Sequence, residues 1–262
     1  MPSLIRVGVP AAQVLAGCGH RMNTARDHGL SLRIENEAQP AQTRQRGWRF
    51  WIKSIFDRAI ALCGLVVLSP VFIAVGVLVW LSMGRPILFR QQRPGRFAKP
   101  FLLLKFRTML DTTDATGKLL PDAGRLTNVG RFLRATSLDE LPQLWNVLRG
   151  DISLVGPRPL LMEYLPRYLP EQARRHDVLP GITGWSQING RNALTWDQKF
   201  SLDTWYVDNW SLKLDALILL KTLSSVLRRT GIASSGHATM PEFKGDGEPS
   251  GPSNESASGT NH

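Results

Sequence analysis

The longest apolar run of the chain lies near its N-terminus. Positions 59–83 are twenty-five residues without a charged side chain. As a helix this run would measure about 37 Å, enough to cross the roughly 30 Å hydrocarbon layer of a membrane. Ser69 and Pro70 fall near its middle, and a proline inside a helix removes one backbone hydrogen bond and clashes with the preceding turn. The pattern therefore predicts a membrane helix over about 55–83 that is broken at Ser69-Pro70.

The apolar positions further along have the shorter periods of an α/β domain. Short apolar runs bounded by turn residues predict three strands, over 86–89, 100–106 and 152–155. Helical spacing predicts four helices, over 138–148, 160–177, 196–206 and 211–229. Pro166 and Pro170 interrupt the second of these helices, and a turn at Arg93-Pro94-Gly95 joins the first two strands. Residues 181–190 are rich in turn formers. We therefore expect an α-rich α/β fold with a small sheet and interfacial amphipathic helices.

Composition divides the chain into three parts. Residues 1–46 are polar with weak periodicity and predict a flexible extension, in which Met22 is an alternative start. Residues 47–232 contain all the predicted elements. Residues 233–262 are rich in Gly, Ser and Pro with little apolar content, which is typical of disorder. No secretory signal is apparent, because residues 1–30 lack a sustained apolar core.

The net charge of +11 is concentrated around the apolar run. Twelve Lys and Arg residues, but a single acid, Asp57, fall between Arg44 and Arg107. Basic residues at both ends of a membrane helix favour keeping both ends in the cytoplasm. We therefore expect a re-entrant helix on the cytoplasmic face of a bacterial inner membrane, whose anionic lipids would attract the basic block. A single membrane span and a buried helix of a soluble protein are the alternatives.

Aromatic residues gather at two places that bear on membrane contact. Trp48, Trp51 and Trp80 bracket the apolar run, as interfacial anchors do. Trp205, Tyr206 and Trp210 lie between the last two predicted helices and fit either anchors or a plain core.

Other function classes explain the sequence less well. Two cysteines, Cys18 and Cys63, provide neither a disulfide framework nor a metal cluster. A basic block also suits nucleic acid, but a nucleic-acid-binding module gives no reason for an uncharged segment of twenty-five residues between two basic clusters. We therefore expect no nucleic-acid partner.

The strongest chemical signal is the acidic pair Asp139-Glu140. One interpretation is a capping box, in which Ser137 caps a helix and Glu140 reaches back to it. Pro142 speaks against this, because proline is better placed as the first helical residue than where a helical N–H is already needed. Adjacent carboxylates do not face each other across a sugar, as glycoside hydrolysis requires. They can share a divalent metal, or one can attack phosphorus while the other binds metal or moves a proton.

A diphosphate substrate also needs fixed positive charge near the carboxylates. Arg134 precedes Asp139 by five residues, and Arg158 lies between two prolines that restrict its backbone. Lys105 and Arg107 add two cations at a predicted strand end. Together with an acidic pair and a membrane element, these cations favour phosphoryl transfer.

Several motifs in a fixed order identify a family. They are Lys53–Arg58, Ser69-Pro70, Lys105–Met109, Ser137–Leu144, Gly156–Pro159, Pro180–Trp185 and Gly190-Arg-Asn192. In these the chain resembles the bacterial sugar transferases, the monotopic polyprenol-phosphate phosphoglycosyl transferases that begin cell-surface glycan assembly. The resemblance covers roughly residues 48–232. This segment lacks the several membrane helices found in longer relatives, so we expect it to be the minimal catalytic form of the family.

The resemblance implies a two-step mechanism. Asp139 would attack the sugar-bearing phosphorus of a UDP-sugar and release UMP, and undecaprenyl phosphate would then take the sugar phosphate from the aspartyl intermediate. Glu140 would assist as a metal ligand or proton acceptor, with Mg2+ held by Asp139 and Glu140. The phosphates would be positioned by Lys105, Arg107, Arg134 and Arg158.

The sequence leaves three questions open: the alternative functions, the sugar and the oligomeric state. A single-span glycosyltransferase that releases UDP and a membrane anchor without catalysis are the alternative functions. The sequence does not identify the sugar, although residues 190–200 are expected to help select it. A homo-oligomer is also compatible with the sequence.

Overall fold

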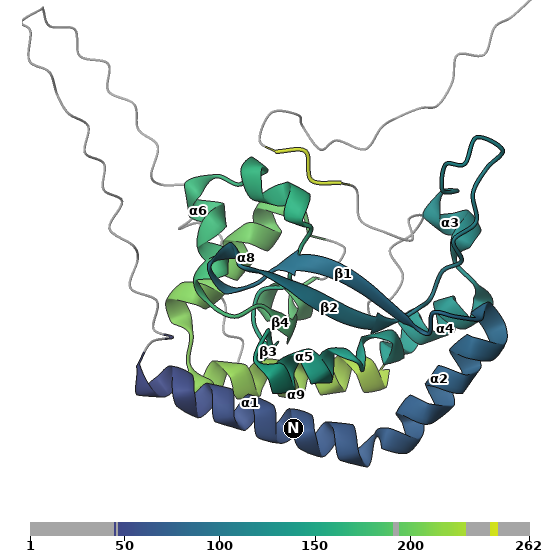
Figure 1. Cartoon of the computed structure of the whole chain (residues 1–262). Coiled ribbons are helices and arrows are strands. Elements are labelled where there is room, and N and C mark those ends of the chain that lie inside the picture. The colour runs from purple at the N-terminus through teal and green to yellow at the C-terminus, as the bar shows by residue number, and fades with distance from the viewer. Residues whose placement is uncertain (1–44, 46, 191–193, 229–241, 246–262) are drawn as a thin grey trace, which may run out of the picture. The chain divides into compact units, whose positions relative to one another are not determined.

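Two helices joined at a sharp bend begin the folded chain. The structure is a computed structural model that describes Gln45 and residues 47–190, 194–228 and 242–245. Helices α1 (Trp48–Val67) and α2 (Ser69–Met83) meet at Leu68 and are bent by 65° (Figure 1). No single helix in these ranges has the length and hydropathy to cross a membrane, and α1 and α2 reach both only as a bent pair.

The bend is built by Ser69 and Pro70. Pro70 lies in the first turn of α2, where the N–H groups have no acceptor within the helix, so its missing donor costs little. The Ser69 hydroxyl donates to the carbonyl of Val66 at 2.8 Å. In a continuous helix that carbonyl would have accepted from position 70. The predicted break is confirmed, but the helix begins at Trp48, earlier than the predicted start near residue 55.

A β-hairpin follows α2. Strands β1 (Leu88–Pro94) and β2 (Pro100–Phe106) pair antiparallel, with Phe89 opposite Lys105. The short helix η2 (Arg96–Ala98) makes the turn between them. The first strand was predicted over 86–89 and is longer, because Arg93 and Pro94 belong to the ladder and the chain reverses only after Gly95.

Short helices connect the hairpin to the second sheet. In chain order they are α3 (Asp122–Arg125), α4 (Asn128–Thr136), η3 (Leu138–Glu140) and α5 (Gln143–Arg149). The predicted helix over 138–148 is therefore present, divided by Pro142 into η3 and α5, and it ends at Gly150 as expected.

A two-stranded parallel sheet lies in the interior. Strand β3 (Ser153–Val155) pairs with β4 (Gly181–Thr183), and β4 falls where only turns were predicted. Glycines allow the two segments to approach closely. A Cβ on Gly156 would lie 2.2 Å from the carbonyl oxygen of Leu179, so no other residue fits there without a backbone shift.

Six further elements complete the described chain. They are η4 (Met162–Arg167), α6 (Pro170–Ala173), η5 (Arg174–Asp177), α7 (Trp185–Ile188), α8 (Trp196–Asn209) and α9 (Leu212–Arg228). Instead of the single interrupted helix predicted over 160–177, three short helices form, because Pro166 and Pro170 prevent a continuous ladder of hydrogen bonds. The last two predicted helices are confirmed in α8 and α9.

The apolar side chains form three clusters. The first joins α1, α5, α8 and α9 around β3 and includes Tyr206 and Trp210, which are core residues and not anchors. The second joins α2, β2 and α4 and receives Leu138 and Leu141. The third is aromatic and includes Phe243. Trp48, Trp51 and Trp80 are all exposed, so the structure leaves their predicted role as anchors open.

A buried polar network fastens α1 to α9. The ammonium of Lys53 lies 2.5 Å from Asp215 Oδ2. The hydroxyl of Tyr206 and the indole N–H of Trp210 donate to the same carboxylate, at 2.7 and 3.0 Å. Buried charges are stable only when they are paired and hydrogen-bonded in this way. The network explains why Lys53 is tolerated at a buried position of the apolar helix α1.

Two parts of the chain expected to be unstructured contribute described residues. Gln45, in the predicted N-terminal extension, is buried and accepts hydrogen bonds from Arg96 and from the backbone N–H of Leu179. Residues 242–245, in the predicted disordered tail, pack against the domain, which corrects the prediction at those four positions. The other residues of 1–46 and 233–262 lie outside the described ranges.

Candidate active site

The acidic pair lies on a single turn between two helices. η3 holds both carboxylates, and Ser137, in the left-handed conformation (φ 57°), ends α4 immediately before it. Leu138 and Leu141 on either side are packed into the second apolar cluster. These two leucine side chains therefore anchor the turn in the apolar interior. The side chains of Asp139 and Glu140 face the cations instead. Ser137 makes no capping hydrogen bond, so the capping-box interpretation is wrong.

Glu140 is held by two cations. Its Oε1 atom accepts from the ammonium of Lys105 at 2.9 Å and from Nη2 of Arg158 at 2.6 Å. Burial pushes the pKa of Glu140 upward, but Arg158 and Lys105 outweigh burial and hold that pKa well below its usual range. The negative charge of Glu140 in turn raises the pKa of Arg158. Glu140 is therefore an ionised, fixed anion.

Asp139 is buried without such partners. Its nearest cation is the Lys105 ammonium, 3.9 Å from Oδ2, beyond hydrogen-bond distance. Burial raises the pKa of Asp139; Lys105 opposes this, while the charge of Glu140 adds to it. Among the residues that the structure describes, none donates a hydrogen bond to Asp139. The two neighbouring carboxylates are thus in different electrostatic states.

Lys105 reaches the pair from the end of β2. The edge of this strand is fixed by Asn146 of α5, whose side chain accepts from the N–H of Leu104 and donates to the carbonyl of Leu102. Burial lowers the pKa of Lys105, and the neighbouring charge of Arg158 adds to this, while Glu140 opposes it. The Asn146 contacts explain how a two-stranded hairpin holds a charged side chain in place.

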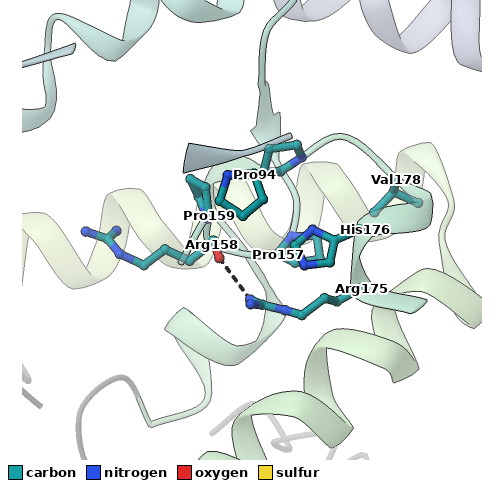
Figure 2. Close-up of a pocket in the computed structure, with 8 residues that line it drawn as sticks. Pro94, Pro157, Arg158, Pro159, Arg175, His176 and Val178 are labelled. Atoms are coloured by element: carbon teal, nitrogen blue, oxygen red, sulfur yellow. Dashed lines mark hydrogen bonds between the residues drawn. The ribbon is translucent and has the colours of Figure 1, made fainter. Parts of the chain in front are cut away.

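Arg158 reaches the pair from the loop after β3. Figure 2 shows its side chain directed away from the rings of Pro94, Pro157 and Pro159. Arg175 holds the backbone at this point, since its Nη2 atom donates to the carbonyl oxygen of Arg158 at 2.8 Å (Figure 2). The guanidinium group of Arg158 is therefore aimed at Glu140 by a fixed backbone.

The other two predicted cations differ in their placement. Arg134 donates to the hydroxyl of Thr108 at 3.1 Å, and its charge lowers the pKa of Asp139, so it lies near the pair. Arg107 donates to the carbonyls of Met83, Arg85 and Met109 and to the Asp111 carboxylate. The structure therefore brings Lys105, Arg134 and Arg158 toward the acidic pair and gives Arg107 partners elsewhere. Its predicted contact with phosphate stays a prediction.

Three further basic residues lie around Arg158 and were not singled out from the sequence. The pKa of Arg93 is lowered to about 10 by burial and by the charge of Arg158, and its Nε atom is buried with no hydrogen-bond partner in the described part of the chain. Burial and the charges of Arg158 and Arg175 lower the pKa of Lys199 to about 8. Arg175 forms a buried ion pair with Asp203, at 2.7 Å. Arg93 and Lys199 thus add positive charge beside Arg158, as an anionic substrate requires.

Sequence alone offered little to reveal these residues. Lys199 lies in the segment expected to select the sugar, but Arg175 and Asp203 are twenty-eight positions apart and have no shared motif. Arg93 was assigned to a turn. Only the fold brings these residues together.

The fit to a metal ion depends on the acidic pair. No group of three or more His, Cys, Asp or Glu side chains that could enclose a metal occurs in the described ranges. Glu140 Oε2 and the Asp139 carboxylate accept no hydrogen bond from any described residue. Mg2+ is commonly held by one or two carboxylates together with substrate phosphates. The pair therefore fits a magnesium ion that binds with its substrate.

The chain is similar in sequence to several known proteins. The family described as bacterial sugar transferase matches residues 48–229. An uncharacterized sugar transferase of Bacillus subtilis, EpsL, is 55% identical, over 75% of this chain and 98% of its own length. The undecaprenyl-phosphate galactose phosphotransferase of Salmonella typhimurium is 39% identical, over 77% of this chain but only 44% of its own length. The UDP-glucose:undecaprenyl-phosphate glucose-1-phosphate transferase of Caulobacter vibrioides is 40% identical, over 67% and 69%.

Proposed function

The chain belongs to the bacterial sugar transferase family and is an enzyme of the phosphoglycosyl transferase class, and from this premise we propose that it transfers a sugar-1-phosphate from a UDP-sugar to undecaprenyl phosphate. Two relatives carry this chemistry in their names, one for galactose and one for glucose. Because their sugars differ, the sugar of this chain is left unassigned.

One observation carries the mechanism: the two adjacent carboxylates are in different states. Glu140 is bound to two cations, whereas Asp139 accepts no hydrogen bond from a described residue. A carboxylate without donors keeps its lone pairs available, and burial removes the water that would weaken it as a nucleophile. These contacts support Asp139 as the attacking group and Glu140 as the anion that positions Lys105 and Arg158.

The reaction then proceeds in two displacements at one phosphorus. An oxygen of Asp139 bonds to the sugar-bearing phosphorus of the UDP-sugar, the bond between that phosphorus and the bridging oxygen breaks, and UMP leaves with the electron pair. A phosphate oxygen of undecaprenyl phosphate next bonds to the same phosphorus, and the Asp139 carboxylate leaves. The products are UMP and a lipid-linked diphosphosugar, and Asp139 is regenerated.

The surrounding cations are suited to the phosphates. Arg158 has a planar fork that matches phosphate oxygens, and Lys105 offers a compact charge beside Asp139. Charge that develops in phosphoryl transfer is stabilised mainly by such fixed groups. Mg2+, held by Asp139 and Glu140, would supply further neutralisation of phosphate charge when bound.

The bent helix pair supports a place at the membrane surface. The exposed side chains of α1 and α2 are mostly large and apolar, and basic residues occur at both ends of the pair. We propose a re-entrant pair in the bacterial inner membrane, with the acidic turn on the cytoplasmic side, where anionic lipids and the lipid phosphate lie.

Product analysis tests the reaction. Purified enzyme is incubated with a panel of UDP-sugars, undecaprenyl phosphate and Mg2+, and the released nucleotide is identified. We expect UMP, none in Asp139→Asn, and wild-type amounts in the matched control Asp122→Asn, whose side chain on α3 is 44% exposed. Release of UDP would establish ordinary glycosyl transfer and overturn the proposal.

Trapping tests the covalent step. After incubation with a radiolabelled UDP-sugar and denaturation, peptide mapping should place the label on Asp139. A label on Glu140 would reverse the two roles, and full activity of Asp139→Asn without any label would exclude an aspartyl intermediate.

Labelling tests the topology. Single cysteines replace the exposed Arg49 and Gln92 in a chain with Cys18→Ser and Cys63→Ser. A membrane-impermeant maleimide should modify both in inverted vesicles and neither in intact spheroplasts. Modification of one site from each side would mean that the pair spans the membrane.

A further inference from the structure

A short piece of the C-terminal region occupies an aromatic pocket beside the active site. We call Glu242–Gly245 the tail segment, and we call the side chains of Tyr164, Tyr168, Trp196 and Phe200 the aromatic pocket. Phe243 is only 3% exposed and belongs to the third apolar cluster of the domain. The family match ends at residue 229, so the tail segment lies outside it.

Phe243 contacts every ring of the pocket. Its ring centroid lies 5.0 Å from Phe200 and 5.6 Å from Tyr164, both edge-on, and 5.5 Å from Trp196. It stacks on Tyr168 at 5.8 Å with an angle of 22° between the rings. These are the distances and orientations that aromatic pairs prefer. One phenylalanine thus completes a pocket of four aromatic side chains.

Polar contacts fix the direction of the segment. Arg167 donates to the Glu242 carboxylate at 2.8 Å and to the carbonyl oxygen of Phe243. The backbone N–H of Phe243 donates to the Tyr164 hydroxyl at 3.3 Å. Side-chain burial and two backbone hydrogen bonds together make this a defined docking site, because each would be lost if the segment bound in another register.

The pocket is connected to the phosphate-binding cations by one chain of contacts. Tyr168, which stacks on Phe243, accepts a hydrogen bond from Arg175 at 3.2 Å. The same Arg175 donates to the carbonyl of Arg158, whose guanidinium binds Glu140. Trp196, a second wall of the pocket, contacts the ammonium of Lys199 at 4.9 Å. Loss of Phe243 would loosen the supports of both Arg158 and Lys199.

We propose that the tail segment docks in the aromatic pocket to position Arg158 and the start of α8 for binding the sugar nucleotide. Phe243 is a positioning residue, since no contact joins it to the acidic pair or to Lys105, Arg134 or Arg158 among the described residues. The docking proposal rests on the proposed function only because its kinetic test measures enzyme activity. Its signature is a higher KM for the UDP-sugar at nearly unchanged kcat, because the support acts on binding and Asp139 is untouched.

The test compares Phe243→Ala with Phe243→Leu in the full chain. We expect the alanine variant to raise KM for the UDP-sugar about five-fold or more, the lower end of typical couplings between sites, with kcat within about twofold. Leucine keeps most of the buried apolar volume and should restore most of the affinity. Phe132→Ala is the matched control, because Phe132 is half-exposed on α4 and has no ring contact among the described residues.

Hydrogen exchange separates this inference from the proposed function. In Phe243→Ala the backbone amides of residues 162–177 should exchange faster, and a blocked Pro-Glu-Phe-Lys-Gly peptide added in excess should slow them again and restore KM. The same peptide with alanine for phenylalanine should do neither. The exchange measurement needs no substrate, so it still tests docking if no UMP is released.

Two results would overturn the proposal. Unchanged exchange in Phe243→Ala would show that the segment does not dock. A fall in kcat and Tm with a rise in KM, equal in both Phe243 variants, would show a general support of the fold without a positioning role.

Discussion

Replacing the two adjacent carboxylates should affect stability in opposite ways. Glu140→Gln keeps the size of the side chain but leaves Lys105 and Arg158 without their anion. Hydrogen bonds to charged groups contribute about 1.5–3 kcal/mol each. The Arg158 side chain is 42% exposed, so its share is reduced by solvent. We expect a loss of about 1.5–2 kcal/mol, which lowers Tm by about 3–8 °C for a domain of this size.

Asp139→Asn should leave the enzyme inactive but no less stable. Because burial raises the pKa of Asp139, the ionised form is the one that folding disfavours. Ionisation of Asp139 therefore lowers the free energy of unfolding. The loss develops as the pH rises from the pKa of Asp139 in the unfolded chain, about 3.9, through its raised pKa in the folded chain. Asparagine removes that cost and the repulsion from Glu140, and loses only the attraction to Lys105 across 3.9 Å.

The assay is thermal unfolding of both variants in detergent, between pH 4 and pH 8, beside UMP release. At pH 7 the Tm of Glu140→Gln should fall, and that of Asp139→Asn should stay or rise. The difference between Asp139→Asn and wild type should grow as the pH increases from 4. Equal falls in Tm for both variants would refute the idea that the two carboxylates are in different electrostatic states.

Three further predictions follow from other contacts. Arg175→Met leaves the buried Asp203 carboxylate unpaired, a loss of about 3–5 kcal/mol, so Tm should drop by about 6 °C or more; a drop below about 2 °C would contradict the buried pair. The pKa of Lys199 is about 8, so KM for the UDP-sugar should rise above that pH as the cation is lost, and Lys199→Arg should abolish the rise; an identical pH profile in the variant would assign it to another group. Gly130→Ala places a Cβ 1.9 Å from the carbonyl oxygen of Thr108, so the yield of folded protein should collapse, and normal yield with normal Tm would show that this contact relaxes freely.

The sequence was most informative where a local rule decided the structure. Proline chemistry located the break at Ser69-Pro70, and the position of Pro142 argued correctly against a capping box. Both follow from the covalent geometry of one residue and its near neighbours. The acidic pair with Lys105 and Arg158 was also named in advance, although its grouping came from the motifs as a set.

Prediction failed where distant segments decide. Lys105 and Arg107 were both placed at the end of a predicted strand and expected to bind phosphate. β2 ends at Phe106, and Arg107 then turns to satisfy carbonyls at the end of α2. β4 was missed because three residues in a turn-rich segment become a strand only when β3 lies beside them. Phe243 was missed because its pocket is assembled from residues between Tyr164 and Phe200.

The second apolar cluster couples the position of the acidic turn to the position of α2. Leu138 and Leu141, on either side of the carboxylates, pack in the same cluster as Val75 and Val79 of α2. An interior at native packing density does not slide easily, so helix and turn move as one body. A shift of α2 by a single helical turn would carry Asp139 with it by about 5.4 Å, more than the span between nucleophile and phosphorus that reaction requires. With α2 in a bilayer, as proposed above, bilayer thickness would become a variable of catalysis, and vesicles of graded acyl length should then show an optimum in turnover.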